Sequence, residues 1–406
     1  MLLHFLLIFG SPVLAEDYEE LEGTRVWFTH YPTAEDPRCV PGCIFNNDTL
    51  DNGTIDIFPK HCSTVCAPYG LIVDDTVING TQLTEILKNM KHLVGKLHVT
   101  TSESKSCSFL VNLETIDCYN SGFFWVQGIG AMMEIGMPKL TNVSCHFRVD
   151  KTNITRLGLP HMKLVPSPTG HDFDIIDLKL HITSLSFCIT MEEMLNLASS
   201  EYIRFNLDSY SKTPLKYCEI SNTSSVKSCD LRNSTLKNLD SGCVWIRGDV
   251  KIGEGDEEYV QKLESVEAIF GRLFITETNL TNIDFFPNLK YIMVLGRDDI
   301  AMLVEDNEFL TNFSFPSFQR TNAEWRTPFQ FYDNSDVLKE QSSRCYGLQK
   351  QLAKNDTSKL TFDGKTCERL EMDSILENHR RKSGGTISKF GLLLIVILSL
   401  LISEPI

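Results

Sequence analysis

The chain is short of basic residues, and this deficit narrows the class of partner. It contains 38 lysines and arginines against 53 aspartates and glutamates, which gives a formal net charge of −15. Proteins that bind nucleic acid or an anionic membrane surface through charge need the opposite balance. We therefore expect no nucleic acid partner, and solubility is a sufficient explanation for the acidic composition.

Motifs of enzymatic chemistry are also missing. The sequence has no His-Glu-x-x-His zinc motif, no Gly-x-Ser-x-Gly nucleophile motif and no phosphate loop ending in Gly-Lys-Ser/Thr. Gly128 and Gly130 lack the third glycine of a dinucleotide fingerprint. The adjacent carboxylates Asp256, Glu257 and Glu258 point in different directions and are expected to be solvated. We predict a protein that is not an enzyme and that uses no cofactor or metal ion.

Long hydrophobic runs are absent as well. The run from Phe390 to Ile402 has 13 residues and would reach about 20 Å as a helix, against a hydrocarbon core of about 30 Å. Ser383 and two glycines precede it, and small residues, a spacer and a short apolar tail are typical of a GPI-attachment signal. We expect residues 368–389 to be a linker with Ser383 as the lipid anchor site, followed by a hydrophobic tail at 390–406. A short membrane span and a plain secreted form are the alternatives.

The other end of the chain indicates secretion. Residues 1–15 form an apolar run that closes on Val13 and Ala15, the small residues of a signal-peptide cleavage site. Ten Asn-x-Ser/Thr sequons follow, and in a secreted chain they predict glycans on surface loops. They are Asn47, Asn52, Asn79, Asn142, Asn153, Asn222, Asn233, Asn279, Asn312 and Asn355. We expect an extracellular protein held at the cell surface.

Thirteen cysteines in such a chain predict a disulfide frame with one thiol left over. Four of them, Cys39, Cys43, Cys62 and Cys66, resemble zinc ligands, but an oxidising compartment favours pairing among themselves. We expect three further bridges: Cys188–Cys218, Cys229–Cys243 and Cys345–Cys367. Cys118 and Cys145 are separated by the same 27 residues as Leu113 and Leu140, so they should bridge adjacent turns. Cys107 aligns with the apolar Ile283 and is the predicted free, buried thiol.

An internal repeat at an offset of 176 residues fixes the architecture. Leu87–Thr100 matches Leu263–Thr276 without gaps, and Phe109–Ile116 matches Phe285–Ile292. Gly95 falls on Gly271. The chain is therefore expected to contain two copies of one domain.

Each copy has a shorter inner period. In the first, Leu113, Leu140 and Met162 recur at spacings of 27 and 22 residues, which is typical of a solenoid built from short strands. Leu97 and Val99 alternate with Lys96 and His98, a period of two that places the first pair inside and the second pair outside. A solenoid needs caps, and Thr190 before two glutamates predicts the start of a closing helix.

These residues resemble a known family. The segment from Cys243 to Ile252, with Leu263 through Ile292, resembles the opening turns of a receptor L domain, the ligand-binding unit of insulin- and EGF-receptor ectodomains. Phe187 through Cys218 resembles the closing segment of kinase-lacking L-domain proteins that are numerous in nematodes. The resemblance covers about residues 39–367. The long cysteine-rich region between the L domains of the insulin receptor is not found here, because only ten residues separate Cys218 from Cys229.

The resemblance implies a β-rich α/β solenoid with two receptor L domains. Each would be a short right-handed parallel β-helix with leucine-rich-repeat-like turns and disulfide-closed caps. The expected divisions are an N-terminal cysteine-containing segment at 16–65, a first L domain at 66–218 and a second at 219–367. No kinase is expected, so only the binding function of the family is carried over.

The function expected from these observations is binding of another protein. The leading hypothesis is a receptor-like, decoy or co-receptor protein for a secreted peptide or growth-factor-type ligand, or for a receptor ectodomain. The alternative is a cell-surface adhesion or matrix protein. A sheet face without sequons is the expected site, and exposed aromatic residues on it would serve as anchors. The candidate ligand-binding residues are Lys251, Phe274, Tyr291 and Met293 as one outward column in the second copy, with Lys96 and His98 in the first.

Overall fold

A computed structural model describes most of the chain between residues 36 and 382. The described part leaves out residues 120–121, 129, 168–175, 200–202, 208–214, 221–225, 296–299, 324–326, 336–341 and 354–359. The predicted signal peptide, Ser383 and the hydrophobic tail lie outside the described residues, as do Asn222 and Asn355. Within the described part, no helix is both long enough and apolar enough to cross a membrane.

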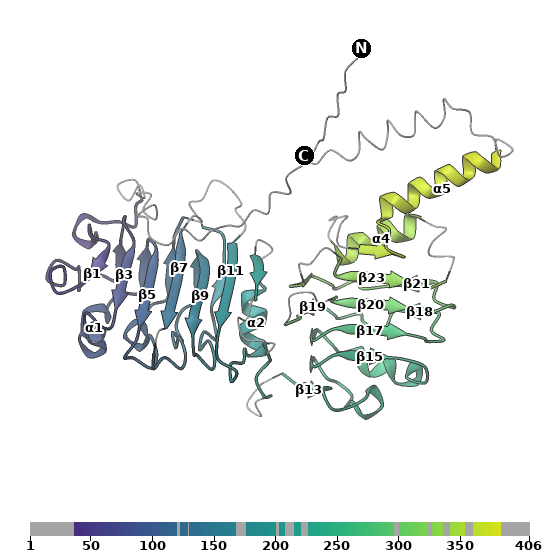
Figure 1. The fold of residues 1–406 in the computed structure, drawn as a ribbon, viewed down its shortest axis with the longest axis horizontal. Coiled ribbons are helices and arrows are strands. Elements are labelled where there is room, and N and C mark those ends of the chain that lie inside the picture. The colour runs from purple at the N-terminus through teal and green to yellow at the C-terminus, as the bar shows by residue number, and fades with distance from the viewer. Residues whose placement is uncertain are drawn as a thin grey trace, which may run out of the picture.

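The first half of the chain builds two parallel sheets, to which successive turns contribute strands (Figure 1). The seven-stranded sheet has the order β1 (Thr49–Leu50), β3 (Leu71–Asp74), β5 (Leu97–Thr101), β7 (Phe123–Gly128), β9 (His146–Thr152), β11 (Ile176–Ile182) and β12 (Ile203–Asn206). The five-stranded sheet has the order β10 (Lys163–Leu164), β8 (Asn142–Ser144), β6 (Thr115–Asp117), β4 (His92–Val94) and β2 (Thr64–Cys66).

The second half repeats this plan on a smaller scale, and we call the part from β1 to β12 the first unit and the part from β13 to β24 the second unit. One five-stranded parallel sheet contains β13 (Ser228–Asp230), β14 (Trp245–Arg247), β16 (Ala268–Phe270), β19 (Tyr291–Ile292) and β22 (Arg320–Thr321). The other contains β15 (Val250–Ile252), β17 (Leu273–Thr276), β20 (Met302–Glu305), β23 (Phe329–Tyr332) and β24 (Leu360–Phe362). A two-stranded sheet joins β18 (Asn282–Ile283) to β21 (Asn312–Phe313).

Short helices flank these sheets. The α-helices are α1 (Gly80–Leu87), α2 (Met191–Leu197), α4 (Ser342–Leu352) and α5 (Cys367–Lys382). The 3-10 helices are η1 (Pro41–Cys43), η2 (Ser108–Leu110), η3 (Leu236–Asn238) and η4 (Glu257–Leu263). The predicted N-cap at Thr190 is confirmed: its side chain accepts from the Glu193 amide, and the Glu193 carboxylate accepts in return from Thr190 N–H.

The inner faces of the sheets form the hydrophobic core. In β5, Leu97 and Val99 are fully buried while the alternate residues His98 and Thr100 are only half-buried, as the alternation predicts. The rings of Phe124 and Phe147 stack in the core at 4.9 Å between β7 and β9. Each strand thus buries its inner side chains against those of the preceding and following turns, which a single turn could not do.

Glycine at the corner between two strands explains the strongest point of the internal repeat. Gly95 links β4 to β5 with φ +142°, and a Cβ atom there would lie 2.3 Å from the Ala67 carbonyl oxygen. Gly271 links β16 to β17, where a Cβ atom would lie 2.4 Å from the Gly248 carbonyl oxygen. Only glycine allows the chain to turn so close to the preceding corner.

Six disulfides close the described structure. Four of them, Cys118–Cys145, Cys188–Cys218, Cys229–Cys243 and Cys345–Cys367, join the pairs expected from the sequence. The N-terminal four cysteines pair as Cys39–Cys66 and Cys43–Cys62, so their thiolates are not available to zinc. Cys107 is free and buried, and burial raises the pKa of its thiol, which keeps it inert.

Candidate ligand-binding face

A row of large side chains crosses the outer face of the seven-stranded sheet. Parallel pairing aligns Ile72 on β3 with His98 on β5, then with Trp125 on β7 and Arg148 on β9. The imidazole of His98 and the indole of Trp125 are stacked, with ring centroids 4.3 Å apart and planes 5° from parallel. The guanidinium carbon of Arg148 lies 5.2 Å from the indole centroid, within cation–π range. The four side chains form one continuous surface.

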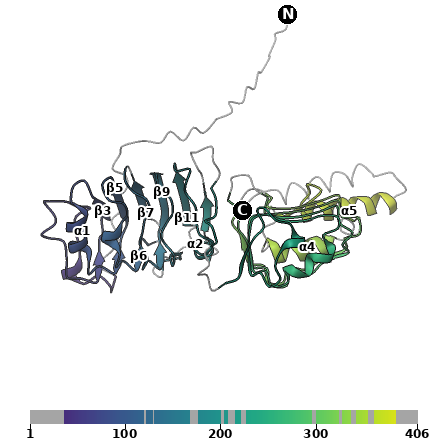
Figure 2. The same ribbon diagram turned by 90° about the horizontal axis from the view of Figure 1, so that it is seen from below.

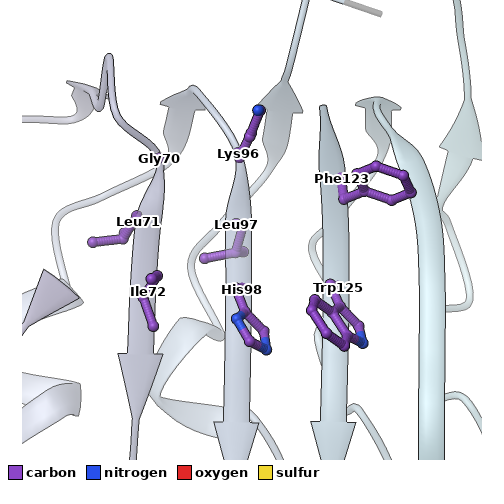
Figure 3. Close-up of a pocket in the computed structure, with 8 residues that line it drawn as sticks. All are labelled: Gly70, Leu71, Ile72, Lys96, Leu97, His98, Phe123 and Trp125. Carbon is purple, nitrogen blue, oxygen red and sulfur yellow. The ribbon is translucent and has the colours of Figure 1, made fainter. Parts of the chain in front are cut away.

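A pocket of about 280 Å³ opens beside this row. Its lining consists of Gly70, Leu71, Ile72, Lys96, Leu97, His98, Phe123 and Trp125, from β3, β5 and β7 and their entrances (Figure 3). In Figure 3 the His98 and Trp125 rings stand side by side on neighbouring strands, with Lys96 and Phe123 above them at the strand entrances. Aromatic and aliphatic walls with a few polar groups are the usual features of a recognition pocket.

Burial shifts the pKa of two of these residues. Burial lowers the pKa of His98, although a hydrogen bond with Gln127 and the negative charges of Asp74 and Asp150 oppose this shift. The Nε2 atom of His98 is buried and finds no hydrogen-bond partner in the described part of the chain. Burial also lowers the pKa of Lys96. The imidazole is therefore disposed to be neutral at neutral pH.

Charged side chains continue the face beyond the aromatic row. The Asp150 carboxylate contacts Nδ1 of His181 at 2.8 Å and also pairs with Arg148. Burial raises the pKa of Asp150, but these two partners outweigh it and the net shift is downward. On β11 and β12, Asp177 lies 3.6 Å from Arg204. The face thus has an aromatic centre and a rim of both charges, as protein interfaces usually do.

Sequons avoid the strands of this face. Seven of the eight described sequon asparagines are exposed and Asn47 is half-buried. None of them falls within a strand of the seven-stranded sheet, whereas Asn142 lies in β8 of the opposite sheet. Figure 2 shows β6, a neighbour of β8, on the side of the first unit opposite β5, β7 and β9. Glycans at these asparagines would leave the aromatic row open.

In the second unit, the predicted column is only partly present. Lys251 and Phe274 are paired neighbours on β15 and β17, and Lys251 Nζ lies 5.9 Å from the Phe274 ring centroid. Arg272 lies over the same ring at 5.1 Å. The next residue in this row is Leu303 on β20.

The other two members of that column were placed wrongly. Tyr291 belongs to β19 in the other sheet, where it pairs with Ala268 and Arg320 and donates to Gln319 Oε1 at 2.6 Å. Met293 is fully buried among apolar side chains. The physical reason is that each turn supplies strands to two sheets, so alternation within one strand does not continue across the following corner.

Sequence reasoning found Lys96 and His98 but missed their partners. Trp125, Phe123, Ile72 and Arg148 complete the row and its pocket. A signal was available, because in β7 the half-buried Phe123 and Trp125 alternate with the buried Phe124 and Val126. The register that brings Trp125 beside His98 needed the structure, since it depends on the whole segment between β5 and β7, which contains η2 and β6.

One cluster in the described part has the geometry of a metal site. Cys43, His61 and Cys62 offer ligand atoms within 4.8 Å of one another. The two sulfur atoms are already bonded to each other in a disulfide, so neither is a thiolate that could hold a metal ion. The cluster is structural.

Comparison with known proteins bears on the second unit. No match to a curated protein was found for the chain. Residues 242–346 match the model of the receptor L domain family. This segment includes the strands from β14 to β23. Receptor L domains are non-catalytic and form ligand-binding, receptor-type ectodomains, and the parallel sheets and six disulfides fit an extracellular domain of this kind. Residues 242–346 are therefore identified as a receptor L domain.

Proposed function

We propose that this protein binds a secreted peptide or growth-factor-type ligand through the row formed by Ile72, His98, Trp125 and Arg148. It would act as a receptor-like, decoy or co-receptor protein without catalytic activity of its own. The observation that carries the proposal is the stacked His98–Trp125 pair beside a 280 Å³ pocket on a face whose strands contain no sequon.

The energetic argument favours an interface. Tryptophan and arginine are the residues that most often dominate binding energy when a partner removes them from water. Keeping an aliphatic residue and an indole together on an outer sheet face does not help solubility. The burial of one large side chain in the pocket would contribute about 1.5–3 kcal/mol.

The pocket also indicates the chemistry of the ligand. Its walls are supplied mainly by Ile72, Phe123 and Trp125, which fit an aliphatic or aromatic side chain. Lys96 stands at the entrance and Arg148 at the far end of the row. A ligand segment with an apolar anchor next to a carboxylate would fit the apolar walls and place its negative charge near these two cations.

Several finer features belong to the same proposal. We propose that residues 66–218 and 219–367 are two receptor L domains, each a right-handed solenoid, because parallel crossover connections are almost always right-handed. The sequence features at both ends support secretion and a lipid anchor at Ser383. The sequons support glycosylation of the loops. Cell-surface presentation would follow from these features.

The test begins with a binding screen of the full-length protein against secreted peptides and receptor ectodomains. Against any partner so found, Trp125→Ser should weaken affinity by about 30-fold or more, as expected for a hot spot worth about 2 kcal/mol. Phe309→Ser is the matched control, because Phe309 is 55% exposed on a loop of the second unit. An unchanged affinity in Trp125→Ser would place the site elsewhere. Self-association of the protein without any ligand would favour an adhesion role.

A further inference from the structure

The described part of the chain begins at a corner between the two sheets of the first unit. Asp36 is buried, and its carboxylate accepts from the Tyr119 hydroxyl at 2.7 Å. Arg38 contacts this carboxylate at 2.6 Å and that of Asp117, the last residue of β6, at 2.8 Å. These contacts hold the start of the described chain where β6 ends and the chain crosses to β7.

The entrance of the ligand pocket lies just beyond this corner. Tyr119 stands four residues before Phe123, which lines the pocket, and four residues span at most about 14 Å. Cys39 is joined by a disulfide to Cys66, which stands four residues before Gly70 in the same lining. In Figure 3, Gly70 and Phe123 lie at the entrance ends of their strands. The first described residues are therefore held near the entrance of the pocket.

The segment that precedes this point has the chemistry expected of a ligand for the pocket. Residues 16–35 lie outside the described part of the chain. Four of these 20 residues are aromatic, Tyr18, Trp27, Phe28 and Tyr31, which is twice the 10% of the whole chain. Six are carboxylates, five of them within 16–22, and one is an arginine. An aromatic anchor in an acidic segment matches the apolar walls and nearby cations of the ligand face.

The length of this segment matches the width of the face. Trp27 stands nine positions before Asp36, and nine residues extend to about 30 Å, which is enough to reach over the pocket. From β5 to β12 the sheet has four strand spacings of about 4.8 Å, or about 19 Å in all. With Trp27 in the pocket, the carboxylates of residues 16–22 would be able to reach β9, β11 and β12.

Cations lie where those carboxylates would fall. Arg148 on β9 is paired in register with Lys179 on β11, and Arg204 on β12 is paired with Asp177 on β11. Lys179 and Arg204 share the Asp177 carboxylate, at 3.9 and 3.6 Å. The Arg204 side chain is 57% exposed, so it remains accessible to a second carboxylate. Exposed ion pairs contribute little individually, so most of the affinity must come from the aromatic anchor.

We propose that residues 16–35 dock on the ligand face of their own chain, with Trp27 in the pocket beside Trp125 and the acidic stretch across β9 to β12. This inference rests on the proposed ligand face and adds its regulation. A short tether gives an effective concentration of about 1 mM, so an intrinsic Kd of about 100 μM would keep the face covered about nine-tenths of the time. A partner would have to displace the segment, which lowers its apparent affinity about tenfold.

The experiment uses a fluorescent synthetic peptide with the sequence of residues 16–35 and the full-length protein. Anisotropy should give a Kd of about 100 μM for the variant Trp27→Ser with Phe28→Ser, and a Kd about tenfold weaker for the unaltered protein, whose own segment competes. Adding Trp125→Ser to the double variant should weaken peptide binding by about tenfold or more. Adding Phe309→Ser instead should leave it unchanged, because Phe309 is exposed in the second unit.

A second peptide tests the contribution of charge. Replacing the five carboxylates of residues 16–22 with glutamine or asparagine should weaken binding to the double variant only about threefold, as exposed ion pairs predict. A loss as large as that caused by Trp125→Ser would contradict the assignment of Trp27 as the main anchor.

Three outcomes would overturn docking within one chain. The first is equal peptide affinity for the unaltered protein and the double variant, because the face would then be open. The second is absence of saturable binding to the double variant. The third is a dimer, detected by sedimentation, that dissociates in the double variant, because the segment would then lie on a second copy. The titration needs no partner, so a partner that binds through Trp125 while the peptide does not would overturn this inference and leave the proposed function standing.

Discussion

The outer faces of the seven-stranded sheet and of the sheet from β15 to β24 differ far more than their inner faces. Position 98 of the first unit corresponds to position 274 of the second in the internal repeat. His98 stacks on Trp125 beside a pocket, whereas Phe274 lies between Lys251 and Arg272 with Leu303 next in its row. One residue earlier on the same two strands, the inward-facing Leu97 and Leu273 are both fully buried.

This contrast separates two kinds of constraint. Inner positions must pack against the turns before and after them, so the two units kept leucine, isoleucine and valine there. Outer positions face solvent or a partner, and a change there costs the fold little. The outer row that holds an aromatic stack, a cation and a pocket is the one to which we assign ligand binding.

The largest expected effect concerns the glycine corner that occurs at equivalent positions in the two units, at Gly95 and at Gly271. Gly95→Ala should destabilise the protein by about 4 kcal/mol, since left-handed strain of about 1–3 kcal/mol adds to about 1–3 kcal/mol of overpacking. The clash is with backbone, because the new Cβ would lie 2.3 Å from the Ala67 carbonyl oxygen. Denaturant unfolding measures the loss, and Gly42→Ala is the control, since no atom lies within 4 Å of a Cβ there. A tolerated Gly95→Ala would mean that the corner relaxes.

A smaller loss of stability is expected from removing a disulfide that only the first unit contains. The Cys118–Cys145 bridge joins adjacent turns inside the first unit over a sequence separation of 27 residues. Replacing both cysteines with alanine should lower the free energy of unfolding by about 3 kcal/mol. At the offset of 176 residues, Cys118 falls on Val294, so the second unit has no cysteine at that place. Cys107→Ala, which removes a thiol that forms no bridge, should cost clearly less in the same denaturation experiment.

The smallest effect is a dependence of ligand affinity on pH, which we expect only for the outer face of the seven-stranded sheet. Burial lowers the pKa of His98 below its usual value of 6.5, and a ligand that covers the pocket would lower it further. Protons therefore compete with the ligand, and affinity should fall about three- to tenfold as the pH drops from about 7.5 to about 5. Stability shifts in the same direction, because the unfolded chain binds this proton more readily.

His98→Gln should flatten this pH profile, with affinity followed by calorimetry across the range. His181→Gln is the control, because His181 contacts Asp150 and not the pocket. The charges of Asp74 and Asp150 act on the imidazole as well, and Lys96 lines the same pocket. A profile that stays steep in His98→Gln would assign the titration to another group.

The sequence predicted the inner structure better than the outer one. Gly95, Leu97 and Val99 could be placed because the repeat with Gly271 and the period of two reflect packing that every turn must satisfy. The bridge from Cys118 to Cys145 followed from the same spacing as Leu113 and Leu140. Half of the proposed column in the second unit was wrong, since Tyr291 and Met293 lie beyond a corner that redirects the chain. Pairing of His98 with Trp125 depends on register, which alternation within one strand does not fix.

Matched glycan insertion tests the assignment of the ligand face most directly. Because Thr100 and Thr276 already stand two residues downstream, His98→Asn and Phe274→Asn each create one sequon at equivalent outer positions. Glycosidase-sensitive mass shifts confirm occupancy, and adding Thr100→Ala or Thr276→Ala removes each glycan while keeping the asparagine. Partner affinity, measured in the full-length protein, should be abolished by the glycan at position 98 and change less than about threefold with the glycan at position 274. Full affinity with an occupied glycan at position 98 would contradict the assignment.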